Sequence, residues 1–296
     1  MKNYKVTISA EPLREYISEL NVSCGAATIK TYVNAICKFI TPSGGEVSRS
    51  AVLDAVAAMQ KQNMSAKTIK FNLKRFVCFC RFAVRRGYVP AELLSELEDI
   101  RLPRGYSKPI QLPDIDTAKE LYRLENFEPE NASYKDLRAV LLSELILTTG
   151  MRAFEISALE FSDIDEENSI IIVRSGKGGK PRSVILHDAA KKLLNAWKKR
   201  TSGKCVFPTL ADENKPISAT RVSSIFREFT SRKINMGLSA HKGRHIFASL
   251  QAEANIPITS IQESLGHNSA QTTALYLQSL RSGQSAKDAQ AAAFGL

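Results

Sequence analysis

The first hundred residues show the hydrophobic spacing of helices. Apolar side chains recur at three-to-four-residue intervals from residue 10 to about 101, which is the period of an amphipathic helix. The spacing is clearest in three segments: residues 12–20, 27–39 and 50–62. Helix-breaking residues at 21–25 and 41–45 separate these segments, and Ser50 and Ser65 have the small polar side chains that favour helix N-caps. The pattern predicts a helical N-terminal domain over residues 1–102.

The predicted helix from about Ser65 to Arg86 has one apolar face and one basic face. At 100° per residue, five cations fall within one narrow stripe: Lys67, Lys70, Lys74, Arg81 and Arg85. Residues 67–86 contain seven basic side chains and no acidic one. Most runs of charged residues are simply solvated surface, and they usually mix acidic and basic side chains. This run contains no Asp or Glu between its basic residues. This favours a helix that packs with its apolar face and binds a nucleic-acid backbone with the other.

The rest of the chain predicts a second domain with a small sheet. Residues 103–113 are rich in proline and basic side chains, which is typical of a semi-extended interdomain linker. Helical spacing returns in several segments: 114–126, 133–148, 153–160, 187–200, 218–233, 241–254, 258–265 and 270–280. Three segments are alternating or β-branched and predict antiparallel strands: 161–165, 169–174 and 182–186. The glycine-rich segment 175–181 is expected at a hairpin tip, and Gly150 at a helix C-terminus. The predicted fold class is mainly α with a small antiparallel β-sheet, the second domain covering 114–296 with a C-terminal tail helix.

The charge balance indicates a polyanionic partner. The 296 residues carry a formal net charge of +11, and residues 1–110 hold 17 of the 41 basic but only 9 of the 30 acidic side chains. The N-terminus lacks the apolar core of a secretory signal, and no apolar run reaches the roughly 18 residues of a membrane span. Five cysteines without CxxC spacing fit free thiols in a reducing cytoplasm. We therefore expect a cytoplasmic protein without a membrane partner.

The chemistry-bearing side chains gather near the C-terminus. Three of the four histidines lie within residues 239–280, together with Arg244 and Tyr276. His241-x-x-Arg244, Gly266-His267 and Tyr276 form a cation-rich set with one phenol and almost no carboxylate. A phenol among positive groups suits attack on a strongly negative group such as phosphate. Each of these residues alone has an ordinary structural explanation. His187 lies outside this set, and we expect it near a helix N-terminus without a catalytic role.

With Arg152 and Lys177 added, the order and spacing of these motifs resemble the tyrosine recombinase (lambda-integrase) family. The resemblance rests on Thr149-Gly150-Met151-Arg152-x-x-Glu155, Gly176-Lys177-Gly178, His241-x-x-Arg244-His245, Leu265-Gly266-His267 and Tyr276. It covers about residues 114–280. Less specifically, the basic helical N-terminal domain resembles the family's core-binding (SAM-like) domain. Gly243 departs from the family's usual leucine, which predicts looser packing around His241 and Arg244.

The resemblance implies a role for each residue. Tyr276 would attack the scissile phosphodiester and form a 3′-phosphotyrosyl bond, which allows rejoining without ATP. Arg152 and Arg244 would bind the non-bridging oxygens and stabilise the transition state. Lys177, favoured over Lys180 by its Gly-Lys-Gly context, would protonate the leaving 5′ oxygen. His241 and His267 would hold the phosphate or handle the tyrosine proton. No cofactor and no metal are expected.

The resemblance also implies partners. They are a double-stranded DNA site with an inverted-repeat core, and three further protomers that form a homotetramer on two sites with a Holliday junction intermediate. The chain is similar to the simple two-domain, Xer-like type, which can pair with a related recombinase or an accessory protein. Apart from the resemblance, the amphipathic, small-residue character of the tail at 284–296 and its terminal position predict that it docks on a neighbouring protomer. Two alternatives stay open: a sequence-specific DNA-binding protein without catalysis, and a nicking and resealing enzyme of the type IB topoisomerase kind. A metal-dependent nuclease is disfavoured because clustered carboxylates are lacking.

Overall fold

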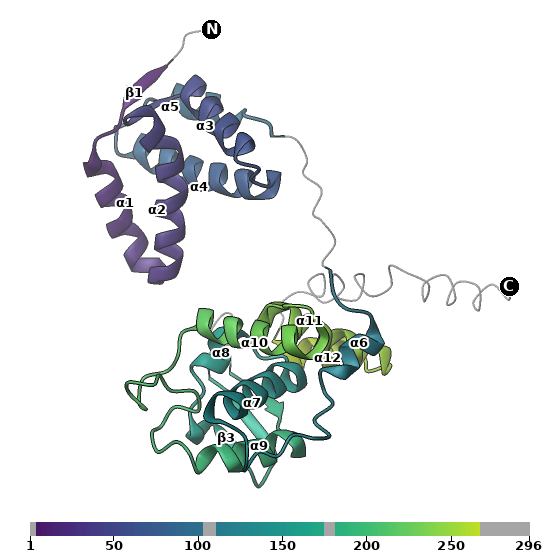
Figure 1. Ribbon diagram of the computed structural model, residues 1–296. Coiled ribbons are helices and arrows are strands. Elements are labelled where there is room, and N and C mark those ends of the chain that lie inside the picture. The colour runs from purple at the N-terminus through teal and green to yellow at the C-terminus, as the bar shows by residue number, and fades with distance from the viewer. Residues whose placement is uncertain (1–3, 103–110, 175–180, 267–296) are drawn as a thin grey trace, which may run out of the picture. The chain divides into compact units, whose positions relative to one another are not determined.

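The computed structural model describes residues 4–102, 111–174 and 181–266 of the chain. The chain separates into two compact units, Met1–Lys108 and Pro109–Leu296. Both are mainly helical, and each holds a small antiparallel sheet (Figure 1). The predicted fold class, mainly α with a small antiparallel sheet, is therefore confirmed.

The described part of the N-terminal unit, residues 4–102, contains five α-helices and two short strands. In chain order these are β1 Lys5–Thr7, α1 Ala10–Ser23, α2 Ala26–Ile40, β2 Glu46–Ser48, α3 Arg49–Lys61, α4 Ala66–Arg85 and α5 Ala91–Glu98. The strands pair antiparallel, with Val6 opposite Val47. The sequence pattern did not predict this pairing. The cap of α3 also differs from the prediction, because Ser48, not Ser50, accepts the Ala51 N–H at 3.2 Å. Ser65 caps α4 as predicted.

Helix α4 forms the centre of this unit. Its apolar face is buried against α1, α2, α3 and α5. Phe76 stacks on Phe39 of α2 with ring centroids 4.7 Å apart, and Phe79 and Phe82 lie against Tyr16 of α1. Aromatic burial of this kind fixes the rotation of α4 about its axis, so the polar side of the helix faces solvent.

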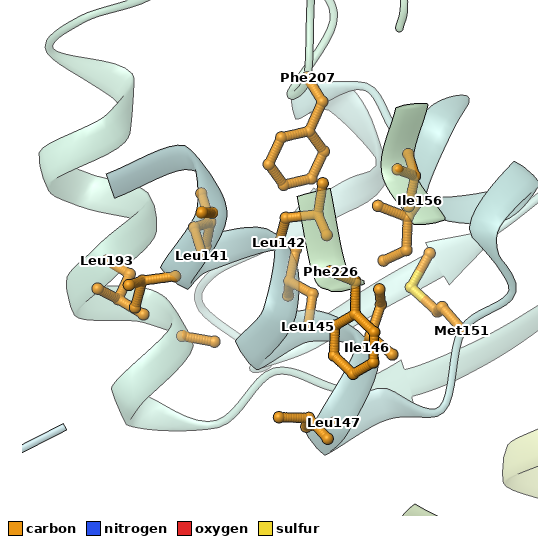
Figure 2. Packing of buried hydrophobic residues seen from close by; sticks show 14 of the residues in the cluster. Leu141, Leu142, Leu145, Ile146, Leu147, Met151, Ile156, Leu193, Phe207 and Phe226 are labelled. Atoms are coloured by element: carbon orange, nitrogen blue, oxygen red, sulfur yellow. The ribbon is translucent and has the colours of Figure 1, made fainter. Parts of the chain in front are cut away.

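The C-terminal unit is built around α7. Its helices are α6 Ile115–Glu120, α7 Tyr134–Thr149, α8 Ala153–Ser157, α9 Asp188–Lys198, α10 Ala219–Ile234, α11 Ala240–Glu253 and α12 Ile258–Leu265. Helix α7 is buried around almost its whole circumference and contacts α9, α10 and α11. Figure 2 shows Leu142 of α7 below Phe207, and Ile146 beside the ring of Phe226 from α10. A helix without a polar face therefore serves as the core of this unit.

The sheet of this unit has the order β3-β4-β5, with β3 Ile164–Asp165, β4 Ile170–Val173 and β5 Arg182–Ile185. Both pairings are antiparallel, with Ile171 opposite Ile164 and Val184. Strands 169–174 and 182–186 were predicted, and of the hairpin tip predicted at 175–181 only Pro181 lies within the described residues. The predicted strand 161–165 was wrong in its first half. Residues Phe161–Asp163 form a 3₁₀ turn, because the Asp163 carboxylate accepts the Glu160 N–H and closes the turn locally.

Two predicted helices are shorter in the structure. The helix predicted over 114–126 ends at Glu120, where hydrogen bonds from Leu121, Tyr122 and Arg123 to residues three positions earlier tighten the chain into turns. The helix predicted over 153–160 ends at Ser157. The helix predicted over 270–280 and the tail at 284–296 lie outside the described residues.

Candidate active site

The end of α7 determines where Arg152 lies. Gly150 follows the helix in the left-handed conformation, with φ of 62° and ψ of 19°, and closes it as a C-cap. A Cβ at Gly150 would come within 2.5 Å of Phe247 Cδ1 and 2.8 Å of Leu265 Cδ2. Glycine is therefore required both by the backbone conformation and by the close approach of α11 and α12. Arg152, two residues later, is the N-cap of α8.

Glu155 holds Arg152 in place. The Glu155 Oε2 accepts the Arg152 backbone N–H at 2.8 Å, and Oε1 accepts Nη1 of its guanidinium at 2.9 Å. The same carboxylate receives both terminal nitrogens of Arg182 from β5, at 2.9 and 2.7 Å. Burial alone would raise the pKa of the Glu155 carboxyl, but these hydrogen bonds and charges outweigh it, and the pKa lies below its ordinary value. The carboxylate is ionised and carries one negative charge between two guanidinium groups.

Arg244 reaches the same region from α11. Only 1% exposed, it donates from Nη1 to the Gly150 carbonyl at 2.5 Å and from Nη2 to the Leu265 carbonyl. Gly243 beside it lets α11 approach α7 and α10, because a Cβ there would lie 2.6 Å from Phe226 Cζ and 2.8 Å from Ile146 Cγ2. The packing around this glycine is thus tight, and the expectation of looser packing was wrong.

His241 is exposed one turn before Arg244 on the same helix. Its ring meets that of buried His245 edge-on, with centroids 4.7 Å apart. Although the residue is exposed as a whole, partial burial of the His241 imidazole, and then the charges of Arg244 and Arg152, lower its pKa below the ordinary 6.5. A neutral imidazole at neutral pH can accept a proton, which suits assistance to a phenol.

Two of the three described candidates, Arg152 and Arg244, meet at the end of α12, and His241 lies close enough to both for their charges to act on it. Arg244 donates to the Leu265 carbonyl, Arg152 Nη2 to the Gly266 carbonyl at 3.4 Å, and both arginines affect the pKa of His241. The other three predicted catalytic residues, Lys177, His267 and Tyr276, lie outside the described residues. The described part of the site therefore consists of two guanidinium groups at one helix end and an imidazole whose pKa their charges lower. It can bind and polarise an anion.

The basic stripe of α4 is exposed along its length, and its five members are Lys67, Lys70, Lys74, Arg81 and Arg85. The two arginines differ from the lysines in their surroundings. Arg81 pairs with Glu98 of α5 at 2.7 Å, and Arg85 pairs with Glu19 of α1 at 3.2 Å. Acidic side chains that are distant in sequence thus partly neutralise this end of the stripe. The lysine end is the stronger cationic surface.

Sequence reasoning missed Arg182. It lies in a predicted strand, where an arginine is an ordinary edge or surface residue, and its partner Glu155 is 27 positions away. The Arg152-x-x-Glu155 spacing was visible, since residues three apart meet at a helix start. Nothing in the sequence indicated that the same carboxylate would also bind a strand residue.

Across residues 4–102, 111–174 and 181–266, three or more His, Cys, Asp or Glu side chains nowhere gather as a metal site would require. Within the same ranges, every helix is too short or too polar to cross a bilayer.

Comparison with known proteins gives a consistent result. Residues 117–282 match the model of the phage integrase family. The tyrosine recombinase XerA of Pyrococcus furiosus is 29% identical over 91% of this chain and 90% of its own length. The TnP I resolvase of Bacillus thuringiensis is 23% identical over 84% of this chain and 88% of its own. The fold is similar to that of a lambda integrase dimer bound to a COC′ core site, with a TM-score of 0.69 at 18% identity, covering 91% of this chain and 95% of that one.

The family match spans more than half of the 296 residues and includes the motifs that carry Arg152, His241 and Arg244. XerA and the resolvase align over nearly their full lengths. Lambda integrase itself has been solved as a dimer on a core site and as a tetramer on a Holliday junction. The chain belongs to the phage integrase family and is a tyrosine recombinase, an enzyme of site-specific DNA recombination.

Proposed function

We propose that Tyr276 is the nucleophile of this recombinase and that it forms a 3′-phosphotyrosyl ester with the cleaved strand. The observation that carries the proposal is the convergence of Arg152 and Arg244 on the end of α12. Gly266, which caps that end, lies one residue before His267 and ten before Tyr276. Two guanidiniums beside the chain that leads to the phenol suit binding of a phosphodiester, whose charge increases in the transition state.

The remaining roles follow from the chemistry of each side chain. A phenol with a pKa near 10 needs a proton acceptor at neutral pH, and His241 is suited because its pKa is lowered and it is neutral there. Lys177 is proposed as the acid that protonates the leaving 5′ oxygen, and His267 as a phosphate ligand. Because the phosphotyrosyl ester retains the energy of the cleaved phosphodiester bond, rejoining of the strand needs no ATP. In this proposal it also needs no metal or cofactor.

We further propose that residues 1–102 bind the DNA core site through the lysine-rich face of α4, and that residues 103–113 link this domain to the catalytic domain 114–296. The site is proposed to be an inverted repeat occupied by two protomers, with a homotetramer joining two sites through a Holliday junction. Lambda integrase is known both as a dimer on a core site and as a tetramer on a Holliday junction, which supports this assembly. A DNA substrate also supports a cytoplasmic location. A related recombinase or an accessory protein could complete the assembly.

The test is covalent capture on a nicked suicide substrate made from the DNA that flanks the gene. The full-length protein is expected to form an adduct that survives denaturing electrophoresis, and mass spectrometry should map the linkage to Tyr276. Tyr276→Phe should form no adduct while its Kd for the same DNA changes by less than about threefold, because only the nucleophile is removed. An adduct in that variant, or a linkage at another residue, would refute the assignment.

A further inference from the structure

Three arginines from three different elements hold the C-terminal end of α12. The carbonyls of Ser264, Leu265 and Gly266 accept hydrogen bonds from Arg182 Nε at 3.0 Å, from Arg244 Nη2, and from Arg152 Nη2 at 3.4 Å, respectively. The last carbonyls of a helix lack partners within the helix and carry its partial negative charge. Cationic donors are therefore well placed there, and they determine the direction in which the chain leaves α12.

The three arginines differ in what else they bind. Arg182 directs Nε, Nη1 and Nη2 to protein oxygens, since it also forms a two-pronged pair with the Glu155 carboxylate. Both partners are nearly buried, at 10% exposure for the Arg182 side chain and 1% for that of Glu155. Arg152, at 19%, is the more exposed of the two guanidiniums on this carboxylate. Arg182 thus has the contacts of a structural cation, and Arg152 those of a cation that can also reach a ligand.

The Arg182 pair connects the parts of the site. Arg182 begins β5, which pairs with β4, so its backbone belongs to the sheet. Its guanidinium binds the Glu155 carboxylate, which also holds the Arg152 guanidinium. Its Nε donates to the Ser264 carbonyl of α12. The Arg182 side chain also lies beside Gly266, where a Cβ would be 3.1 Å from its Cδ. Glu155 and the end of α12 thus each have hydrogen bonds to Arg182 that do not involve Arg152.

We propose that Arg182 is a positioning residue of this recombinase: it holds Glu155, and thereby Arg152, in register with the end of α12 while Arg152 binds the scissile phosphate. The inference rests on the proposed function, because it assigns Arg152 to the phosphate. A buried two-pronged ion pair with an added carbonyl contact resists displacement, whereas removing one partner leaves a buried charge. The chemical step should therefore respond to Arg182 more strongly than DNA binding does.

The test measures single-turnover adduct formation at saturating DNA, together with the Kd for the same DNA. Arg182→Gln should slow cleavage by about 100-fold or more with the Kd changed less than about threefold, since small misplacements of catalytic groups have effects of this size. Arg182→Lys keeps the positive charge but cannot form the two-pronged pair with Glu155. Its cleavage rate should therefore be higher than that of Arg182→Gln and within about tenfold of wild type. Arg174→Gln is the matched control. It too changes a β-hairpin arginine that pairs with a buried carboxylate, Asp163, and it should cleave at the wild-type rate.

A second substrate distinguishes two explanations of a slow Arg182 variant. The substitution could misplace Arg152, as proposed, or it could misplace Lys177, which lies between β4 and β5 in the sequence. A 5′-bridging sulfur is a better leaving group and makes the proposed acid dispensable. This substrate should restore cleavage by Lys177→Ala but leave the Arg182→Gln defect in place. Restoration of Arg182→Gln by sulfur, or cleavage by both Arg182 variants within threefold of wild type, would overturn the inference. Absence of an adduct with the wild-type protein would instead refute the proposed function.

Discussion

Replacing Gly150 with alanine should destabilise the C-terminal unit far more than the same replacement at Gly266. Both glycines have left-handed backbones, with φ of +62° and +59°. Their surroundings differ. An added Cβ at Gly150 meets the packed side chains of Phe247 and Leu265 at 2.5 and 2.8 Å, but at Gly266 the nearest atom is Arg182 Cδ at 3.1 Å. The pair therefore separates the effect of conformation from that of packing.

The expected magnitudes follow from these two effects. A left-handed conformation costs an alanine roughly 1–2 kcal/mol at either position. Overpacking in a close-packed interior adds about 1–3 kcal/mol, and this applies at Gly150 alone. Gly150→Ala should thus lower the free energy of unfolding by about 2–5 kcal/mol, and Gly266→Ala by about 1–2 kcal/mol.

Trp197 provides the assay. It is the only tryptophan of the chain, it is fully buried in the C-terminal unit, and its indole N–H donates to the Val206 carbonyl at 2.6 Å. Its fluorescence during urea denaturation reports unfolding of that unit without a contribution from tryptophan elsewhere, and the midpoint and slope give the free energy. If the two variants differed from each other by less than about 0.5 kcal/mol, the close approach at Gly150 would not be a determinant of stability.

Two further predictions concern other parts of the chain. Burial raises the pKa of Glu144 from 4.5 to about 7, so this carboxyl stabilises the fold below pH 4.5, and that contribution disappears as pH rises through about 7. Glu144→Gln should accordingly be more stable than wild type by up to about 3 kcal/mol at pH 8 and equally stable at pH 4.5. Trp197 fluorescence measures both stabilities, and the same stability difference at the two pH values would contradict this prediction. Neutralising Lys70 and Lys74 should weaken DNA binding and lower the slope of log K against log salt by about 0.9 for each DNA phosphate that the protein no longer neutralises. Neutralising the two ion-paired arginines of the same stripe should lower it less, and an unchanged slope in the lysine variant would refute a role of this face.

Local patterns determined most of the helices. The segment predicted over 133–148 is α7, Tyr134–Thr149, and it is capped by Ser133 and ended by Gly150. Period, cap and glycine are properties of neighbouring residues, so they can be read from the sequence before the fold is known. The same holds for the two faces of α4, because both are defined within one helix.

Contacts between distant residues were decided only by the tertiary structure. Strand β1 pairs with β2 about forty positions later, and neither segment is long enough to reveal its partner. The cationic character of Arg152 and Arg244 could be predicted, but not that both would donate to the end of α12. In the sequence, Arg182 is an ordinary strand residue, and only the tertiary packing of β5 places its guanidinium at Glu155. Hydrogen bonds between elements depend on such packing, which no local sequence pattern encodes.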